Sequence, residues 1–578
     1  MFRGWILIPI LALAAAAQPS NVPAQTKFRI SGTVVDAVRG GVLPDIEVSI
    51  GTSQAESLLQ TVTTGPDGRF EFDGLPPGKY AMTANARGYG QQGFEEHEGY
   101  FTGIVTGPGM ASENLQFRLK PESSISGTVT DEFNDPAPFA QVLLFTTGRL
   151  DESQMVLLQS QAVVDDAGHF HFSRLKEGKY YLAVYGSPWY AHDPAEEAEA
   201  DPGERITTDG SDAQPGGSGV EHPADRPRAD RPGDDRSRED RRSEYDVAFP
   251  TTYYANAGTA EQATPIILKP GDRATADFHL FAVPSAHLKV HSSPSLAKAG
   301  GSVALLEPIF NYSRQAAMQG LGDNATQLGG IAPGQYILQF TANGESQQQP
   351  LNLTGDLDVA PGDARKFVSG VTGTVQLEGS GAPCLHCYVQ LMNAISGERL
   401  GTQVTARGFE IQGGARPGRY YIELLNSDDY EASTIVASGG RMIGSQLEIT
   451  GGAAVRLTIT ATKALGTIDG IALLDGKPVS QTAVLLLPNN PTHNLILFRR
   501  DQSDSDGTFT LRRVLPGDYT VIAVADGWDL EWNDPSVRKA YVAGGVKIHI
   551  QPQGGKYQVK VPVQTKHGLA AENLPPQN

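Results

Sequence analysis

One motif returns along the whole chain and constrains its fold more than any other feature. Its clearest copy has Ser-Gly-Thr-Val at 31–34, Asp-Gly-Arg-Phe at 67–70 and a Pro-Gly-Lys-Tyr turn that ends at Tyr80. The closing Gly-x-Tyr part also ends at four later tyrosines, Tyr180, Tyr336, Tyr420 and Tyr519. Self-similarity of this kind marks a repeated folding unit, so we expect five units.

Each part of the motif predicts a turn or a strand. Glycine in the Asp-Gly pair supplies the positive φ that a tight hairpin needs, and Phe70 and Phe72 then begin a period-two alternation into a core. The Pro-Gly pair predicts a second turn with glycine in the left-handed conformation. Each tyrosine starts a strand, and we expect its ring to be buried and its hydroxyl to bond to the turn backbone.

These patterns predict an all-β fold, a tandem array of about five small antiparallel β-sandwich domains. The 65 glycines and 38 prolines among 578 residues agree with many turns and short strands. A unit of about 80 to 100 residues can bury enough apolar surface to fold alone, so we expect separate domains. The third unit lacks the first two parts of the motif. The expected domains span 28–120, 123–281, 283–360, 367–463 and 466–565.

Three segments lie outside these domains. Arg3 precedes an apolar run from Trp5 to Ala17, which predicts a signal peptide at 1–24, with cleavage after Ala17 or Ala24. An uncleaved anchor is the alternative, although the run is shorter than a spanning helix needs, and we expect no transmembrane segment after cleavage. Residues 192–245 are rich in charge, proline and glycine and predict a disordered insertion in the second domain, and we expect a disordered tail at 566–578.

The three blocks resemble the carboxypeptidase regulatory-like repeats of exported bacterial proteins. The first, second and fifth units carry the resemblance most fully. It implies a transthyretin-like sandwich, which is also grouped with carbohydrate-binding-like folds. It further implies a non-catalytic accessory or surface module, because the regulatory domain of metallocarboxypeptidases sits beside the peptidase and performs no chemistry.

No sequence motif for catalysis is found. None of the 12 histidines begins His-x-x-Glu or His-Glu-x-x-His, and neither a Gly-x-Ser-x-Gly elbow nor a phosphate loop occurs. We therefore expect no enzyme activity, no cofactor and no metal. The net charge of −19 disfavours nucleic acid as a partner. His169 and His171 are expected on a polar strand face, and the acidic residues before Gly507 are expected to form a plain turn.

The only two cysteines are Cys384 and Cys387, in a Cys-x-x-Cys pattern. In an exported protein we expect them to form a local disulfide. Free thiols, a redox dithiol and two of the four ligands of a zinc site are the alternatives. Covalent haem attachment is excluded because Tyr388, and not histidine, follows the second cysteine.

Aromatic residues in loops are the candidate ligand contacts. Sugar rings stack on exposed aromatic faces, and loops carry most binding residues. The same rings could instead pack between domains, because large aromatic side chains usually bury most of their area. The candidates are Trp189, Tyr190, Tyr253, Tyr254, Trp528 and Trp532.

The leading expectation is a non-catalytic secreted or envelope-associated scaffold, adhesion or ligand-binding protein. It would lie outside the cell, in the periplasm or at the cell surface. A carbohydrate-binding protein that uses the loop aromatics is one alternative, and an accessory subunit of an envelope enzyme or transporter is another. A carbohydrate or an envelope protein would then be the partner, and the sequence selects no oligomeric state.

Overall fold

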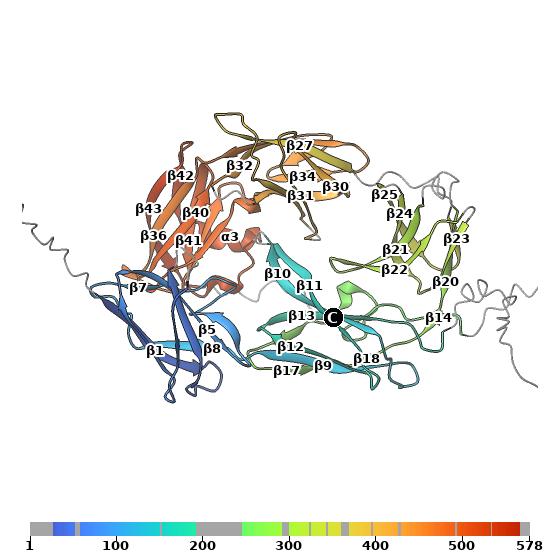
Figure 1. Cartoon of the computed structure of the whole chain (residues 1–578), viewed down its shortest axis with the longest axis horizontal. Coiled ribbons are helices and arrows are strands. Elements are labelled where there is room, and N and C mark those ends of the chain that lie inside the picture. The colour runs from blue at the N-terminus through green and yellow to red at the C-terminus, as the bar shows by residue number, and fades with distance from the viewer. Residues whose placement is uncertain are drawn as a thin grey trace, which may run out of the picture.

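The computed structural model describes residues 27–52, 58–150, 153–191, 245–291, 300–322, 325–342, 345–359, 369–394, 397–425, 429–491, 494–532 and 534–566. The described part consists mainly of β-strands grouped into five sandwiches that follow one another along the chain (Figure 1). The expected signal peptide lies outside these residues. So does the expected disordered insertion, apart from Tyr245, and so does the expected tail, apart from Lys566.

The first domain shows the arrangement that the others repeat. Its strands are β1 (Phe28–Asp36), β2 (Glu47–Thr52), β3 (Leu58–Thr63), β4 (Arg69–Leu75), β5 (Gly78–Ala86), β6 (Gly90–Gly93), β7 (Ile104–Thr106) and β8 (Leu115–Leu119). One sheet has the order β4-β1-β8, and the other has β3-β2-β5-β6, with β7 also paired to β5. The opening strand β1 is antiparallel to β4 and parallel to the last strand, β8.

The second and third domains follow the same plan. The second has β9 (Ser123–Thr130), β10 (Gln141–Leu150), β11 (Ser153–Val163), β12 (His169–Leu175), β13 (Gly178–Tyr185), β14 (Val247–Ala248), β15 (Thr252–Tyr253), η1 (Ala260–Gln262), β16 (Ile266–Leu268), β17 (Arg273–Thr275) and β18 (Phe278–His279). The third has β19 (Val283–Pro284), β20 (Ala286–His291), β21 (Ser302–Ile309), β22 (Tyr312–Gly320), β23 (Ala325–Ile331), β24 (Gly334–Ala342), β25 (Glu345–Leu353) and β26 (Leu357–Val359).

The fourth and fifth domains complete the chain. The fourth has β27 (Ser369–Leu377), β28 (Tyr388–Asn393), β29 (Arg399–Gln403), β30 (Phe409–Ala415), β31 (Gly418–Leu425), β32 (Glu431–Ser438), β33 (Arg441–Ile443), β34 (Gln446–Ile449) and β35 (Val455–Thr462). The fifth has β36 (Gly466–Leu474), β37 (Lys477–Pro478), β38 (Ala483–Pro488), η3 (Leu495–Leu497), β39 (Arg499–Gln502), β40 (Thr508–Val514), β41 (Gly517–Val524), η4 (Gly527–Asp529), α3 (Pro535–Val542), β42 (Val546–Ile550) and β43 (Gly555–Gln564).

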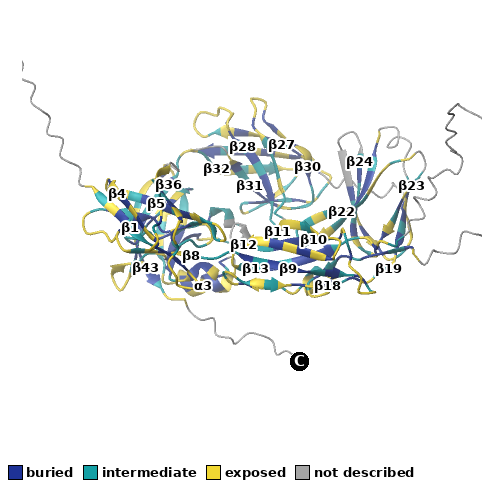
Figure 2. Cartoon of the chain, turned by 60° about the horizontal axis from the view of Figure 1, so that its bottom comes forward, coloured by how far each residue is buried: buried dark blue, intermediate teal, exposed yellow. Residues whose placement is uncertain are grey.

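All five domains share one pairing scheme. The opening strands β1, β9, β20, β27 and β36 each lie between an antiparallel neighbour and a parallel last strand. The tyrosine strands β5, β13, β24, β31 and β41 each pair with the first strand of the hairpin before them. Buried residues lie where the two sheets of each domain face each other (Figure 2). The five sandwiches therefore share the pairing of their opening strands and of their tyrosine strands.

Glycine in the Ser-Gly-Thr-Val block makes room for the phenylalanine of the next block. Gly32 lies opposite Phe70 across the β1–β4 pair. A Cβ atom at Gly32 would lie 2.3 Å from the carbonyl oxygen of Leu115 and 2.9 Å from the Phe70 ring. In the fifth domain, a Cβ atom at Gly470 would lie 2.2 Å from the ring of Phe509. The two blocks occur together because each one needs the other for packing.

The third domain keeps the topology although it lacks both blocks. Val290 of β20 lies opposite Thr326 of β23, at the register position where the first domain has Gly32 opposite Phe70. A valine and a threonine of nearly equal size stand where the first domain has a glycine and a phenylalanine. Exchanges that keep the total volume are the substitutions that cores tolerate best. The missing motif therefore reflects a different pair of facing residues and not a different fold.

Two expectations about the turns are corrected. Gly68 has a φ of 71°, as a tight turn needs, but its turn joins β3 to β4, which belong to different sheets, so it is not a hairpin. The Gly-x-Tyr glycines do not take the left-handed helical conformation, whose φ is about 57°. Gly178 and Gly418 have φ values of 156° and 158° and begin strands. A Cβ of Gly418 would lie 2.9 Å from Nδ2 of Asn393, so the glycine leaves space for that side chain.

The five tyrosines share one geometry. All are buried, between 0% exposed at Tyr420 and 4% exposed at Tyr336. Each hydroxyl donates a hydrogen bond of 2.7 to 2.9 Å to the carbonyl oxygen four residues earlier. The donors are Tyr80, Tyr180, Tyr336, Tyr420 and Tyr519, and the acceptors are Pro76, Lys176, Ala332, Arg416 and Leu515. Each ring thus ties a turn to the strand that follows it.

The first and last domains of the chain are in contact. The first and fifth domains lie side by side at the left of Figure 1, although they are the most distant in sequence. The second domain runs along the bottom of that view and the third stands at its right. The fourth lies at the top, next to the fifth. The positions of candidate binding residues therefore depend on contacts between the domains.

Candidate functional site: the contacts between domains

Trp528 lies at the centre of the interface between the first and fifth domains. It belongs to η4 and is only 7% exposed. The ring of His97 stacks on it with 5.4 Å between centroids and 7° between planes, and Tyr100 stacks at 5.7 Å and 28°. Both residues come from the loop between β6 and β7 of the first domain. Aromatic pairs contribute about 0.5 to 1.5 kcal/mol each beyond the area they bury.

An ion pair crosses the same interface. The Nζ atom of Lys79 lies 2.6 Å from Oδ2 of Asp504 and 2.7 Å from the Thr508 hydroxyl. Oδ1 of Asp504 accepts a hydrogen bond of 2.9 Å from the backbone N–H of Gly103. Burial raises the pKa of Asp504, and the pairing with Lys79 opposes that rise. The acidic turn before Gly507 is therefore used to contact the first domain.

Buried hydrogen bonds fix the register of this interface. The side-chain amide of Gln502, which is 1% exposed, donates to the carbonyl oxygen of Glu95 and to the hydroxyl of Thr102, at 2.7 Å each. The backbone N–H of Ser505 donates to the carbonyl oxygen of Gly103 at 2.9 Å. Leaving a buried polar group without its partner costs about 1 to 3 kcal/mol. The two domains therefore fit in one defined orientation.

Trp528 and Trp532 do not form a carbohydrate platform, which corrects that expectation. Trp532 is 0% exposed, its indole N–H donates to the carbonyl oxygen of Gly527 at 3.1 Å, and its ring packs on Tyr541 of α3 at 5.4 Å. A ring that stacks on a sugar needs at least one exposed face, and neither tryptophan has one. Trp528 packs between the first and fifth domains instead, which was the alternative.

Tyr253 is likewise covered, in this case by the third domain. Phe310, at the β21–β22 turn, inserts beside Phe145 at 4.8 Å and meets Tyr253 edge-on at 5.4 Å. Tyr253 is 5% exposed, and burial raises its pKa. Tyr254 packs edge-on against Phe278 at 6.0 Å, in the core of its own domain. Tyr253 therefore has no open face for a ligand, and Tyr254 serves packing.

Trp189 and Tyr190 are the candidates that remain at the surface. Trp189 is 72% exposed. Tyr190 is half-buried, and its hydroxyl donates to a carboxylate oxygen of Glu132. Its ring lies 5.6 Å from that of Trp189 and 6.0 Å from that of Phe133, which is itself 66% exposed. We call Trp189, Tyr190 and Phe133 the aromatic patch.

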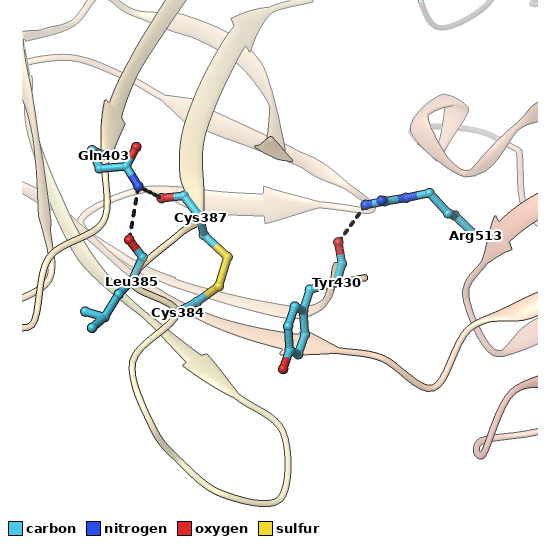
Figure 3. The surroundings of a disulfide bond; sticks show 6 residues. All are labelled: Cys384, Leu385, Cys387, Gln403, Tyr430 and Arg513. Atoms are coloured by element: carbon cyan, nitrogen blue, oxygen red, sulfur yellow. Dashed lines mark hydrogen bonds between the residues drawn. A yellow bond between two sulfur atoms is a disulfide. The ribbon is translucent and has the colours of Figure 1, made fainter. Parts of the chain in front are cut away.

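Cys384 and Cys387 form a disulfide in the fourth domain, with 5.4 Å between their Cα atoms. The side-chain amide of Gln403 donates to the carbonyl oxygens of Leu385 at 3.1 Å and Cys387 at 3.0 Å (Figure 3). The cysteines are 5% and 0% exposed and belong to the domain core. Redox catalysis needs an accessible sulfur, so this bond suits a structural role at the start of β28.

Two further searches concern the described residues alone. No group of three or more histidine, cysteine, aspartate or glutamate residues is placed there to hold a metal ion. No helix in that part of the chain is long and apolar enough to cross a membrane. His169 and His171 lie on the exposed face of β12.

The contact residues of the first domain were missed by sequence reasoning. Lys79 occupies the variable position of the Gly-x-Tyr block, and His97 and Tyr100 lie in a loop. The one available signal was the length of that loop, which runs from Gly93 to Ile104 and holds several aromatic and acidic residues. Nothing local to it indicates the partner domain.

Residues 29–120 match the family model of the carboxypeptidase regulatory-like domain. The first domain is therefore a carboxypeptidase regulatory-like domain, and the opening and tyrosine strands of the other four pair as they do in the first. No curated protein matches the chain.

Solved structures similar to the chain include the TIE protein of Bacillus anthracis, at 9% identity and a TM-score of 0.17 over 94% of this chain and 76% of that one. A streptococcal ancillary pilin has 9% identity and a TM-score of 0.18 over 58% and 99%. A minor pilin of Streptococcus agalactiae has 11% identity and a TM-score of 0.20 over 44% and 96%. At TM-scores this low, nothing about the function of this chain follows from the likeness.

Proposed function

We propose that this chain is a non-catalytic, exported structural protein that holds five sandwich domains in a closed arrangement outside the cell, as a scaffold for an envelope partner. The interface between the first and fifth domains is the observation that carries the proposal. Tandem domains joined by linkers move relative to one another unless a specific interface holds them. An interface between the two ends of a chain restrains every domain between them.

The contacts elsewhere support a fixed arrangement. The second and third domains meet around Phe310, and the guanidinium of Arg314 lies 4.2 Å above the ring of Tyr185. The fourth and fifth meet where Nε of Arg513 donates to Glu431 at 2.8 Å. Aromatic contacts and ion pairs between neighbouring domains restrain the orientation of one domain relative to the next. They suit a scaffold better than a hinged enzyme.

Export and the lack of catalysis rest on other observations. The apolar N-terminal run is typical of a signal peptide, and disulfides form and persist in oxidising compartments outside the cytosol. The usual hydrolase and nucleotide-site motifs do not occur in the sequence. The candidate ligand residues of the fifth domain are occupied by interdomain packing or by its own core.

The test is a distance measurement in the intact chain. Spin labels placed on exposed loops of the first and fifth domains should give one narrow distance distribution by pulsed electron paramagnetic resonance. Lys79→Glu should broaden it, because it places two carboxylates together at Asp504. Lys179→Glu is the matched control, since Lys179 holds the same motif position in the second domain. A broad distribution in the unmodified chain would refute the closed scaffold.

Carbohydrate binding is the second candidate function, and one observation favours it. In the aromatic patch Trp189 is 72% exposed, and the neighbouring Tyr190 donates to the carboxylate of Glu132. Exposed aromatic faces next to hydrogen-bond acceptors are typical of sugar contacts. Glycan-array binding should be lost in Trp189→Ala and kept in Phe281→Ala, a control at another exposed aromatic residue of the second domain, which is 58% exposed. Binding that survives Trp189→Ala would exclude the patch.

A further inference from the structure

The fourth domain departs from the shared topology directly after its tyrosine strand. In the first, third and fifth domains, β6, β25 and β42 directly follow the tyrosine strand and pair with it. In the fourth domain the next strand, β32, pairs with β35 and so extends the opposite sheet. That sheet has the order β30-β27-β35-β32, which makes β32 an edge strand.

The edge formed by β32 carries the usual protection only at its start, where Glu431 and a register shift at Ser433 lie. β32 has eight residues, no proline, and one charged residue, Glu431. After a register shift at Ser433 it pairs regularly from Thr434 to Ser438, and Val436 is 59% exposed. Within the described residues β35 is the one strand it pairs with. Natural edge strands are normally short or carry lysine, proline or inward-pointing charges, because an open row of backbone groups recruits another strand.

A groove of about 750 Å³ borders this strand, between the fourth and fifth domains. Its apolar lining includes Ile435 and Met442 of the fourth domain and Ile496 and Leu497 of the fifth. It therefore places a partly apolar lining beside β32, and it continues the interface between the two domains. Grooves of a few hundred to about 1,000 Å³ are of the size that holds specific ligands.

The charges at one end of the groove are already paired. Glu431 accepts from Nε of Arg513 at 2.8 Å and lies 3.5 Å from Arg499. Arg513 also donates to the carbonyl oxygen of Tyr430 at 2.7 Å (Figure 3). A charged ligand would have to compete with these pairs. A neutral ligand with apolar groups would not.

We propose that this groove binds an extended, uncharged polypeptide segment of a partner protein, which adds to the edge of β32 as a further strand. A row of backbone N–H and C=O groups is matched by another extended backbone, with alternate side chains turned to one face. Those side chains meet the apolar lining. The inference rests on the proposed scaffold function and names the chemistry of its partner.

The test uses the full chain and a synthetic, fluorescein-labelled peptide of alternating threonine and valine flanked by serine. Anisotropy should show saturable binding, and hydrogen exchange should show new protection in β32. A second peptide, N-methylated at alternate residues, cannot donate along one edge and should bind at least about tenfold more weakly. Equal binding of the two peptides, no saturable binding, or protection confined to another edge strand would each overturn the proposal.

Two variants localise the effect. Val436→Lys places a charge on the exposed face of β32 and should weaken peptide binding about tenfold. Val163→Lys is the matched control, because Val163 is 57% exposed on β11, an edge strand of the second domain. The Val163→Lys variant should bind the peptide as tightly as the unmodified chain. Equal weakening by both variants would contradict the site.

Two other outcomes would be distinct. If the chain dimerises in sedimentation analysis and Val436→Lys abolishes the dimer, the occupant is a second copy and the assignment to a partner protein is wrong. If the peptide does not bind while the distance between the first and fifth domains stays narrow, this inference fails and the scaffold stands.

Discussion

Lys79→Ala should loosen the contact between the first and fifth domains without unfolding either one. The Lys79 side chain is 33% exposed and lies outside the core of its domain. The Asp504 side chain is 17% exposed and would keep the backbone N–H of Gly103 as a donor after losing the ammonium group. Removing one partner from a buried hydrogen bond costs about 1 to 3 kcal/mol, and the remaining donor places this case near 1 to 2 kcal/mol.

The assay is native-state hydrogen exchange of amides whose hydrogen bonds cross the interface. The N–H of Gly103 donates to Asp504, the N–H of Val105 donates to the Ser505 hydroxyl at 2.9 Å, and the N–H of Ser505 donates to Gly103. Their exchange reports local opening. A cost of about 1 to 2 kcal/mol corresponds to about 5- to 30-fold faster exchange.

The matched control is Lys179→Ala, at the same motif position in the second domain. It should leave these amides unchanged, and amides in the centre of β1 should stay protected in both variants. Unchanged exchange of Gly103 and Ser505 in Lys79→Ala would refute the reasoning. Equal acceleration in β1 would show that the first domain unfolds instead of separating.

Three further predictions concern stability. Tyr336→Phe removes the 2.7 Å hydrogen bond from the tyrosine hydroxyl to a buried carbonyl oxygen. It should lower the free energy of unfolding of the third domain by about 1 kcal/mol in denaturant titration. An unchanged free energy of unfolding would show that this hydrogen bond does not stabilise the turn. Gly32→Ala should cost more than about 2 kcal/mol by the same measurement, because its Cβ would lie 2.3 Å from a backbone oxygen, whereas Gly370→Ala, which meets nothing within 4 Å, should be almost neutral. Burial raises the pKa of Asp501 to about 6, so the folded carboxyl holds its proton more tightly than the unfolded one. The resulting stability should be complete below the ordinary pKa of 3.8 and be lost as the pH rises through 6, and a pH series of unfolding should flatten in Asp501→Asn; an equal slope in both proteins would contradict the assignment.

The first domain as a carboxypeptidase regulatory-like fold and the all-β array of sandwiches could be predicted from the sequence. Turns and strand alternation depend on residues close together in the chain, and the Gly-x-Tyr block carries that information in three residues. The burial of Tyr80 and its bond to Pro76 follow the same local logic. The third domain was harder to read, because Val290 and Thr326 stand where the first domain has its glycine and phenylalanine.

The contacts between domains could not be read in this way. A tryptophan in a loop has the same local sequence whether it is exposed, as Trp189 is, or stacked under another domain, as Trp528 is. The outcome depends on His97, which is more than 400 residues away in the chain, and no local pattern encodes such a pairing. The move of β32 to the opposite sheet is of the same kind. Sequence alone determined the repeated unit, through short-range turns and alternation, and the tertiary structure decided which surfaces those units cover and which they leave open.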